Sequence, residues 1–241
     1  MKLNLEKAIK KIGEEESLHT AKLFSSKNHA WNRSIETVFR ACLTNPTLAP
    51  GNVKGKTPSE AIEAWVKKYW NGYDGRISKR ESNPPGTIPD PMINTIIGNR
   101  LTHLTDNDLE NIKYAHRISM SAENILGLLL EEFLALELEK FGWHCAWGET
   151  IKSVDFCHED GRLLQVKNRS NSENSSSSRV REGTVIAKWF RVNANNGSYK
   201  WDELNKIHNT AIFSEQSFRR FVIQVIQANP GALAVEDSNP W

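Results

Sequence analysis

The sequence lacks the features that would place it in a membrane or outside the cell. No apolar run reaches the roughly 18–20 residues that a membrane-spanning helix needs. The three cysteines, Cys42, Cys145 and Cys157, are odd in number and widely spaced, which argues against a disulfide framework and against a zinc site. The N-terminus is amphipathic and carries acids, so it resembles neither a signal peptide nor a typical transit peptide. We therefore expect a cytoplasmic protein with no membrane partner.

A large excess of one charge sign is also missing, because the formal net charge is only +2 over 241 residues. A composition of 39% hydrophobic and 25% charged residues is ordinary for a globular protein that is long enough to bury a core. The charge is unevenly spread, however. Between Arg162 and Arg191, seven lysines and arginines stand against two acids. This thirty-residue window therefore holds more positive charge than the net excess of the whole chain.

The first half of the chain has helical periodicity, and the second half has short segments typical of strands. Thr57, Pro58 and Glu60 predict a helix start with an N-cap and a capping box. After Gly142, β-branched and aromatic residues alternate with turn residues, which indicates strands. We expect a helical N-terminal region and a core with a long buried helix and a mixed sheet flanked by helices, an α/β or α+β fold. The helical N-terminal region is expected to cover 1–118 and the core 119–241. The expected helices are 3–24, 31–44, 58–70, one from 105, 122–141 with a cap at Ser119 or Ser121, 201–208 and 214–228. The expected strands are 143–147, 153–157, 162–168 and 184–192, and the expected loops are 74–92 and 170–183.

Two of the expected strands form a hairpin that carries polar residues, Asp155 on the first strand and Gln165 and Lys167 on the second. A three-residue loop ending in Gly161 pairs position 155 with 165, and glycine suits the left-handed last position of such a loop. A two-residue turn would instead pair 155 with 166 and send Gln165 and Lys167 to the other face. The sequence permits both registers. Only the first register brings the three polar side chains together.

If these side chains meet, they can serve metal-assisted phosphodiester hydrolysis. Asp155 is a hard oxygen ligand suited to Mg²⁺, Gln165 offers a weaker amide oxygen, and the Val166 carbonyl lies between them. Lys167 can orient the attacking water or stabilise charge that develops on phosphorus. A second acid is needed to hold the cation, and we choose Glu123 on the long helix, where Gly127 would allow close approach to the sheet. The alternatives on the same helix are Glu131 and Glu132.

This arrangement resembles the PD-(D/E)XK nuclease superfamily, in which an acid on a helix precedes an Asp on one strand and an acid-x-Lys motif on the next. The matching residues here are Glu123, Asp155, Gln165 and Lys167, with Val154 in place of the usual proline and Gln165 in place of the acid. A narrower resemblance is to the SinI-like group of type II restriction endonucleases, carried by SMSAENILGLLLEEFLA, VDFCHEDGRLLQVKNRSNSENSSSS and KWFRV. It implies a Mg²⁺-dependent homodimer that cuts both strands of DNA at a short palindromic site, GGWCC.

The basic window supplies the candidates for contact with double-stranded DNA. The polar loop 170–183 is rich in serine and is flanked by arginines. Arginine pairs with guanine, asparagine with adenine, and lysine contacts phosphate. The predicted contacts are Arg169, Asn171, Asn174, Arg179, Arg181, Lys188 and Arg191, with Arg179 and Arg181 as the readers of bases.

Other interpretations of the same residues are open at this point. Asp155, Gln165 and Lys167 could form an ordinary solvated strand face, Glu123 could simply favour the helix dipole, and loop 170–183 could be a linker. A burial argument favours a site, because a lysine between apolar stretches is costly unless it is paired. The competing functions are an Mrr-like or repair nuclease on the same fold and a DNA-binding module without activity.

Overall fold

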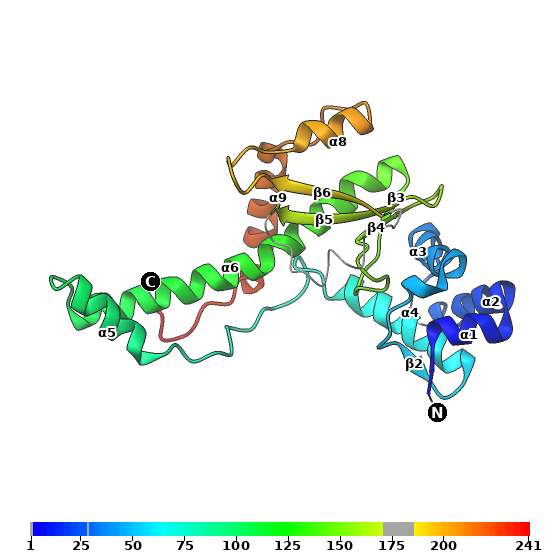
Figure 1. The fold of residues 1–241 in the computed structure, drawn as a ribbon, viewed down its shortest axis with the longest axis horizontal. Coiled ribbons are helices and arrows are strands. Elements are labelled where there is room, and N and C mark those ends of the chain that lie inside the picture. The colour runs from blue at the N-terminus through cyan, green and yellow to red at the C-terminus, as the bar shows by residue number, and fades with distance from the viewer. Residues whose placement is uncertain (1, 28, 171–185) are drawn as a thin grey trace. The chain divides into compact units, whose positions relative to one another are not determined.

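A four-stranded mixed sheet carries the predicted hairpin in the computed structural model, which describes residues 2–27, 29–170 and 186–241. The strand order is β3 (Trp143–Cys145), β4 (Phe156–His158), β5 (Leu163–Arg169) and β6 (Ile186–Val192). The first three strands are antiparallel and β6 runs parallel to β5, as Figure 1 shows. The expected α/β class with a mixed sheet flanked by helices is confirmed.

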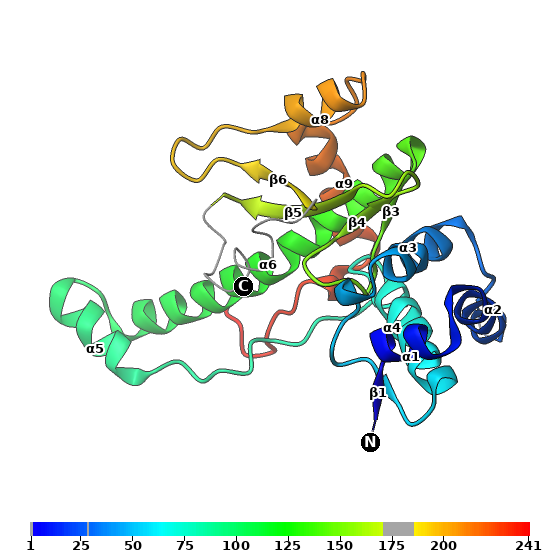
Figure 2. The same ribbon diagram turned by 45° about the vertical axis from the view of Figure 1, so that its right-hand side comes forward.

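One face of this sheet packs against the N-terminal helices. Cys157, Leu163 and Ile186 lie on neighbouring strands and join a buried cluster with Phe39, Trp65 and other residues of these helices. The positive φ of Gly13 (83°) splits the helix expected at 3–24 in two. Figure 2 shows these elements together: β1 (Leu3–Asn4), α1 (Leu5–Ile12), α2 (Glu14–Ser25), α3 (Arg33–Thr44), the 3₁₀ helix η1 (Pro46–Leu48), β2 (Lys54–Gly55) and α4 (Pro58–Asp74).

The other face of the sheet is closed by aromatic packing. Val166 and Trp189 are paired across β5 and β6, and Trp189 contacts Trp201 at the start of α8 (Trp201–Ile207), with ring centroids 5.2 Å apart. Trp201 in turn meets Phe133 of α6 (Asp106–Leu138). Because side chains alternate along a strand, Gln165 and Lys167 lie on the opposite face, with Leu163. The sheet therefore has helices on both faces.

By its internal contacts, the chain divides into two compact units. Unit 1 comprises Met1–Arg76 and Leu130–Arg219, and unit 2 comprises Ile77–Leu129 and Arg220–Trp241. Unit 2 contains α5 (Pro91–Arg100), the first part of α6, most of α9 (Glu215–Ala228) and the 3₁₀ helix η3 (Pro230–Ala232). These bounds differ from the expected functional division into 1–118 and 119–241, which stays a prediction.

Two expectations about the helices are wrong. Helix α6 runs without a break from Asp106 to Leu138, past Ser119 and Ser121, because no proline or glycine interrupts it there and serine is tolerated inside a helix. Helix α5 begins at Pro91, at the end of the expected loop, with Asp90 as its N-cap: the Asp90 side chain accepts a hydrogen bond from Met92 N. A 3₁₀ turn, η2 (Glu139–Phe141), then connects α6 to the sheet.

Candidate active site

The hairpin has the first of the two registers that the sequence permits. Phe156 pairs with Leu164 and Cys157 with Leu163. Continued by one residue, this register places Asp155 opposite Gln165. His158 N donates to Arg162 O (2.8 Å) and Gly161 N donates to His158 O (2.9 Å), which closes a three-residue loop. Gly161 has φ 93°, in the left-handed region where a side chain would be strained. The expected loop and its glycine are confirmed.

Asp155 lies one residue before β4, at an irregularity in the pairing. Its N–H donates to Leu164 O (2.9 Å), although Leu164 is already the partner of Phe156. Two residues thus oppose one, as in a β-bulge, a feature that re-aims side chains beside active sites. Asp155 Oδ2 accepts a hydrogen bond from Val166 N (2.7 Å). The carboxylate is therefore fixed against β5 at the residue between Gln165 and Lys167.

Glu131 is the helical acid that shares an electrostatic environment with this hairpin. Burial and, after it, the Asp155 carboxylate raise the pKa of Glu131, Lys167 opposes the shift, and the resulting pKa is about 8. Glu149, an exposed residue with φ 55°, also raises the pKa of Glu131. Three acids and a lysine thus interact electrostatically. Glu149 was missed by the sequence analysis because nothing in the turn Trp147-Gly148-Glu149 indicates its direction.

The other two acids of the long helix have different surroundings. Glu132 is buried and forms an ion pair with Arg76 (3.6 Å), whose guanidinium lies over the Tyr73 ring. Glu123 is exposed and belongs to the part of α6 in unit 2. It lies eight residues before Glu131, about 12 Å along a helix axis. Glu131 is therefore the one of these three acids whose pKa is affected by Asp155 and Lys167.

The donor set suits a small divalent cation. Glu131 and Asp155 offer hard carboxylate oxygens, and the pKa of Glu131, about 8, shows that Lys167 offsets burial and the second acid only in part. Gln165 is buried in β5 and is paired across the sheet with Lys188. Among the described residues, no group of three or more His, Cys, Asp or Glu side chains forms a ready-made metal cage.

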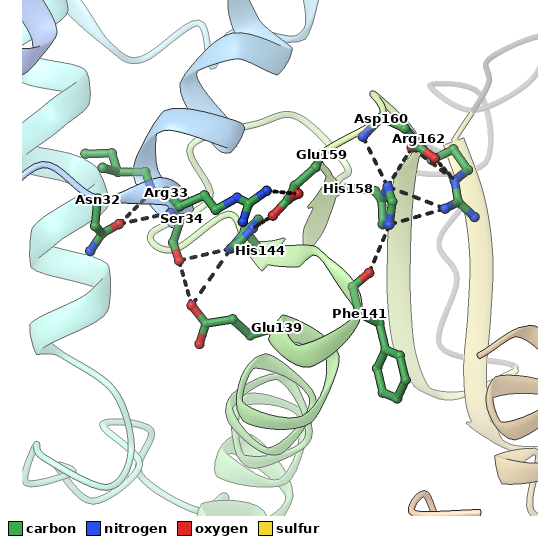
Figure 3. A network of polar contacts seen from close by, with 11 residues as sticks. Asn32, Arg33, Ser34, Glu139, Phe141, His144, His158, Glu159, Asp160 and Arg162 are labelled. Carbon is green, nitrogen blue, oxygen red and sulfur yellow. Dashed lines mark hydrogen bonds and ion pairs between the residues drawn. The ribbon is translucent and has the colours of Figure 1, made fainter. Parts of the chain in front are cut away.

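The opposite end of the hairpin holds a separate polar network, shown in Figure 3. Buried His144 on β3 contacts Ser34 Oγ through Nδ1 (3.0 Å) and Glu159 Oε1 through Nε2 (3.1 Å). Arg33 pairs with Glu159 (2.5 Å), which ties the start of α3 to the hairpin loop. In the same network His158 Nε2 contacts Phe141 O (2.9 Å). These groups satisfy one another, so they are structural contacts rather than a reactive site.

The predicted DNA contacts have unequal surroundings. Arg169 and Lys188 are exposed on β5 and β6. Arg191 is buried instead: its Nε donates to Asn168 Oδ1 (2.9 Å), and its guanidinium pairs with Glu215 and lies near the Phe218 ring. Its surroundings are therefore those of a structural cation. The remaining candidates, Asn171, Asn174, Arg179 and Arg181, lie outside the described residues.

A four-stranded mixed sheet with helices on both faces defines the class, a restriction-endonuclease-like α/β fold. The chain belongs to the SinI restriction endonuclease family, which matches residues 20–228. It is 43% identical over 168 residues to the type II restriction enzyme Eco47I of Escherichia coli, covering 68% of this chain and 71% of that enzyme. It is 41% identical over 157 residues to the type II restriction enzyme SinI of Salmonella infantis, covering 63% and 67% of the two chains.

The expected activity class is thereby confirmed: the chain is a type II restriction endonuclease, a site-specific nuclease that acts on DNA. Within the described part of the chain, no helix is both long and apolar enough to cross a membrane.

Proposed function

We propose that this endonuclease hydrolyses double-stranded DNA in a Mg²⁺-dependent reaction at a short palindromic site, GGWCC, and that it acts as a homodimer. The observation that carries the chemistry is the position of the Asp155 carboxylate, which accepts a hydrogen bond from Val166 N (2.7 Å) between Gln165 and Lys167 and raises the pKa of Glu131. The ionised form of a half-buried acid beside a second acid is disfavoured unless a cation balances the two charges. The site sequence and the homodimer rest on the resemblance of the sequence to the SinI-like group.

In this proposal Glu131 and Asp155 hold the cation, and the Gln165 amide and the Val166 carbonyl are further oxygen donors. Asp155 is oriented for this role by the hydrogen bond from Val166 N (2.7 Å). When bound, Mg²⁺ would supply positive charge that neutralises the scissile phosphate and polarises it. Glu131 replaces Glu123 as the helical acid, because Glu131 interacts electrostatically with Asp155 and Lys167.

Lys167 positions the reaction at phosphorus. Its ammonium group orients the attacking water and stabilises the charge that develops on the phosphate oxygens. The water oxygen forms a bond to phosphorus in line with the bond to the 3′ oxygen, which breaks. The products are a 5′-phosphate and a 3′-hydroxyl. The exposed side chains of Arg169 and Lys188 contact the DNA, and Arg179, Arg181, Asn171 and Asn174 contact it from loop 170–183.

The test is incubation of the protein with plasmid DNA, with and without Mg²⁺, followed by sequencing of the fragment ends. We expect discrete fragments only with Mg²⁺, all ending at GGWCC. Discrete fragments with other ends would reject the proposed site and leave the chemistry intact. Smearing or nicking that depends on DNA structure or methylation would favour an Mrr-like or repair nuclease, and a gel shift without cleavage would favour a DNA-binding module.

A further inference from the structure

The exposed apolar side chains are concentrated in unit 2. Among the described residues, sixteen large apolar side chains are exposed, and ten of them belong to unit 2, which has fewer than a third of the residues. Isolated exposed apolar residues are normal, but a contiguous group marks an interaction surface. Unit 2 therefore contains the surface that most needs a partner.

Helix α5 presents this feature most clearly. Its sequence, PMINTIIGNR, is apolar on more than one side, yet none of its residues is buried. Several large apolar side chains that are exposed together on one helix indicate a contact surface. The exposed fractions are 58% for Met92, 50% for Ile93 and 65% for Ile96, and Ile88 just before the helix is 93% exposed.

The face of α5 that carries these residues points away from α6. Asn94 Nδ2 donates to Glu110 Oε1 (3.3 Å), and a Cβ on Gly98 would lie 3.2 Å from Leu109 Cδ1, so Asn94 and Gly98 face α6. At about 100° per residue, Met92 and Ile96 lie roughly 160° round the helix from Asn94. Met92 and Ile96 are therefore on the outer face of the pair that α5 and α6 form side by side in Figures 1 and 2.

The segment before α5 is held in place rather than loose. Arg117 of α6 donates to Pro85 O (2.8 Å) and Thr87 O (2.6 Å) and pairs with Glu236. Ile88 is thus presented by a fastened backbone. The backbone on its N-terminal side is held by Arg117, so the Ile88 side chain is exposed in a fixed position. An apolar side chain fixed in this way can bind a partner without first being ordered.

We infer that Ile88 and the outer face of α5 (Met92, Ile93 and Ile96) form the dimer interface, and that its occupant is the same face of a second copy. This inference rests on the proposed homodimer, because two cuts at a palindromic site call for two copies related by a two-fold axis. A two-fold interface is self-complementary, and with the axis perpendicular to α5 the helix would pack antiparallel to its counterpart. The exposed Asp90 at the start of α5 would then face the partner's Arg100 at the end. The charges at the two ends of the helix complement one another in this arrangement.

The size of this face is also appropriate. At about 25 cal/mol per Å² and 1.5–3 kcal/mol per buried side chain, each fully exposed apolar side chain offers roughly 60–120 Å². The four side chains, at 93%, 58%, 50% and 65% exposure, therefore supply roughly 150–300 Å². A standard interface takes about 800 Å² from each partner, of which about 60% is apolar. The face supplies about half of that apolar area, and neighbouring residues of unit 2 supply the rest.

Sedimentation velocity of the full-length protein at micromolar concentration tests the inference with a matched pair of variants, Ile96→Glu and Ile207→Glu. Both residues are on helices and are exposed to nearly the same extent, 65% and 63%, but Ile207 lies on α8 of unit 1. We expect the wild type and Ile207→Glu to be dimers and Ile96→Glu to dissociate at least 100-fold more readily. A dimeric Ile96→Glu variant would overturn the inference and leave the homodimer intact. A monomeric wild type would reject both the interface and the proposed homodimer. The nuclease activity would still be tested separately by the plasmid assay.

A cross-linking experiment decides the matter if Ile96→Glu fails to fold. Cys42, Cys145 and Cys157 are buried, so a cysteine introduced on the surface has little background. Mild oxidation should convert Ile96→Cys, but not Ile207→Cys, to a disulfide-linked dimer. Absence of that dimer, or equal cross-linking of both variants, would overturn the inference.

Discussion

Acids lie at both ends of the β4–β5 hairpin, at its tip (Glu159 and Asp160) and at its base (Asp155, with Glu131 of α6). The pKa values are shifted in opposite directions at the two ends. At the tip, a hydrogen bond from His144 lowers the pKa of Glu159, and Arg33 lowers it further. Burial acts to raise the pKa of Asp160, but hydrogen bonds from the Arg162 N–H and from His158 outweigh it, so this pKa is lowered too. At the base, burial and Asp155 raise the pKa of Glu131 to about 8. The tip acids are balanced by cations and hold the fold together, whereas at the base Lys167 only partly offsets the rise in the Glu131 pKa.

The largest expected effect is that of Lys167→Ala at the base. Loss of the ammonium group removes both the orientation of water and the stabilisation of charge on phosphorus, so the cleavage rate should fall by about 10³-fold or more. DNA binding, measured by gel shift, should change little. Arg162→Ala is the matched control, because it removes an exposed cation at the tip of the same hairpin and should leave the rate within about twofold. A normal rate for Lys167→Ala would mean that the base is not the active site.

The second effect is that of Glu131→Gln, which retains the shape of the side chain and removes its charge. We expect cleavage to fall by about 10²-fold or more, because a weaker ligand holds the cation and electrostatic terms of this kind have that size. Glu123→Gln on the same helix is the control and should cut at a rate close to that of the wild type. The reverse result would return the role of helical acid to Glu123.

The hairpin could be predicted from the sequence because its geometry is local. A three-residue loop with Gly161 in the left-handed position sets the register, and alternation then puts Gln165 and Lys167 on one face. The bulge at Asp155 could not be predicted in the same way, because it depends on how Asp155 N and Phe156 share Leu164. The register is a property of the turn, and the bulge is a property of the packed sheet.

The helical acid and the buried arginine depend on distant parts of the chain. Three acids on α6 look alike in sequence, and only tertiary packing distinguishes Glu131 from Glu123. Likewise, Arg191 lies in a basic window that suggests DNA, but Glu215 of α9 meets it in the folded protein. Local patterns indicate which residue types are candidates, but they are insufficient where residues of the same type on different segments differ only in their tertiary contacts.

The third effect concerns stability at the tip. His144→Ala should lower the free energy of unfolding by about 2 kcal/mol, because Ser34 and Glu159 lose a buried partner. Chemical denaturation measures this loss. His19→Ala, at an exposed histidine of α2, should change stability by no more than about 0.5 kcal/mol. Below its melting temperature, His144→Ala should cut DNA at a normal rate, and a large loss of activity in the folded variant would make the tip part of the active site.

The smallest effect links pH to the cation. The pKa of Glu131 is about 8 in the folded protein and 4.5 is its ordinary value, so the folded state favours the protonated acid. This raised pKa contributes stability that is fully present below about pH 4.5 and is lost as the pH rises through about 8. The melting temperature without Mg²⁺ should therefore fall by a few degrees between pH 6 and pH 8.5, on the scale of about 2–4 °C per kcal/mol. Mg²⁺ should reverse that fall, because the bound cation takes the place of the proton on Glu131 and balances the charges of Glu131 and Asp155.

Glu131→Gln separates this explanation from a general effect of pH on the protein. The variant has no proton to lose at position 131, so its melting temperature should fall less between pH 6 and pH 8.5 and should respond little to Mg²⁺. The Glu159→Gln variant at the tip should keep the full response, because Arg33 and His144 already balance that carboxylate. Equal responses of the two variants to Mg²⁺ would mean that the base has no greater need of a cation than the tip, and the contrast between the two ends would then lose its functional meaning.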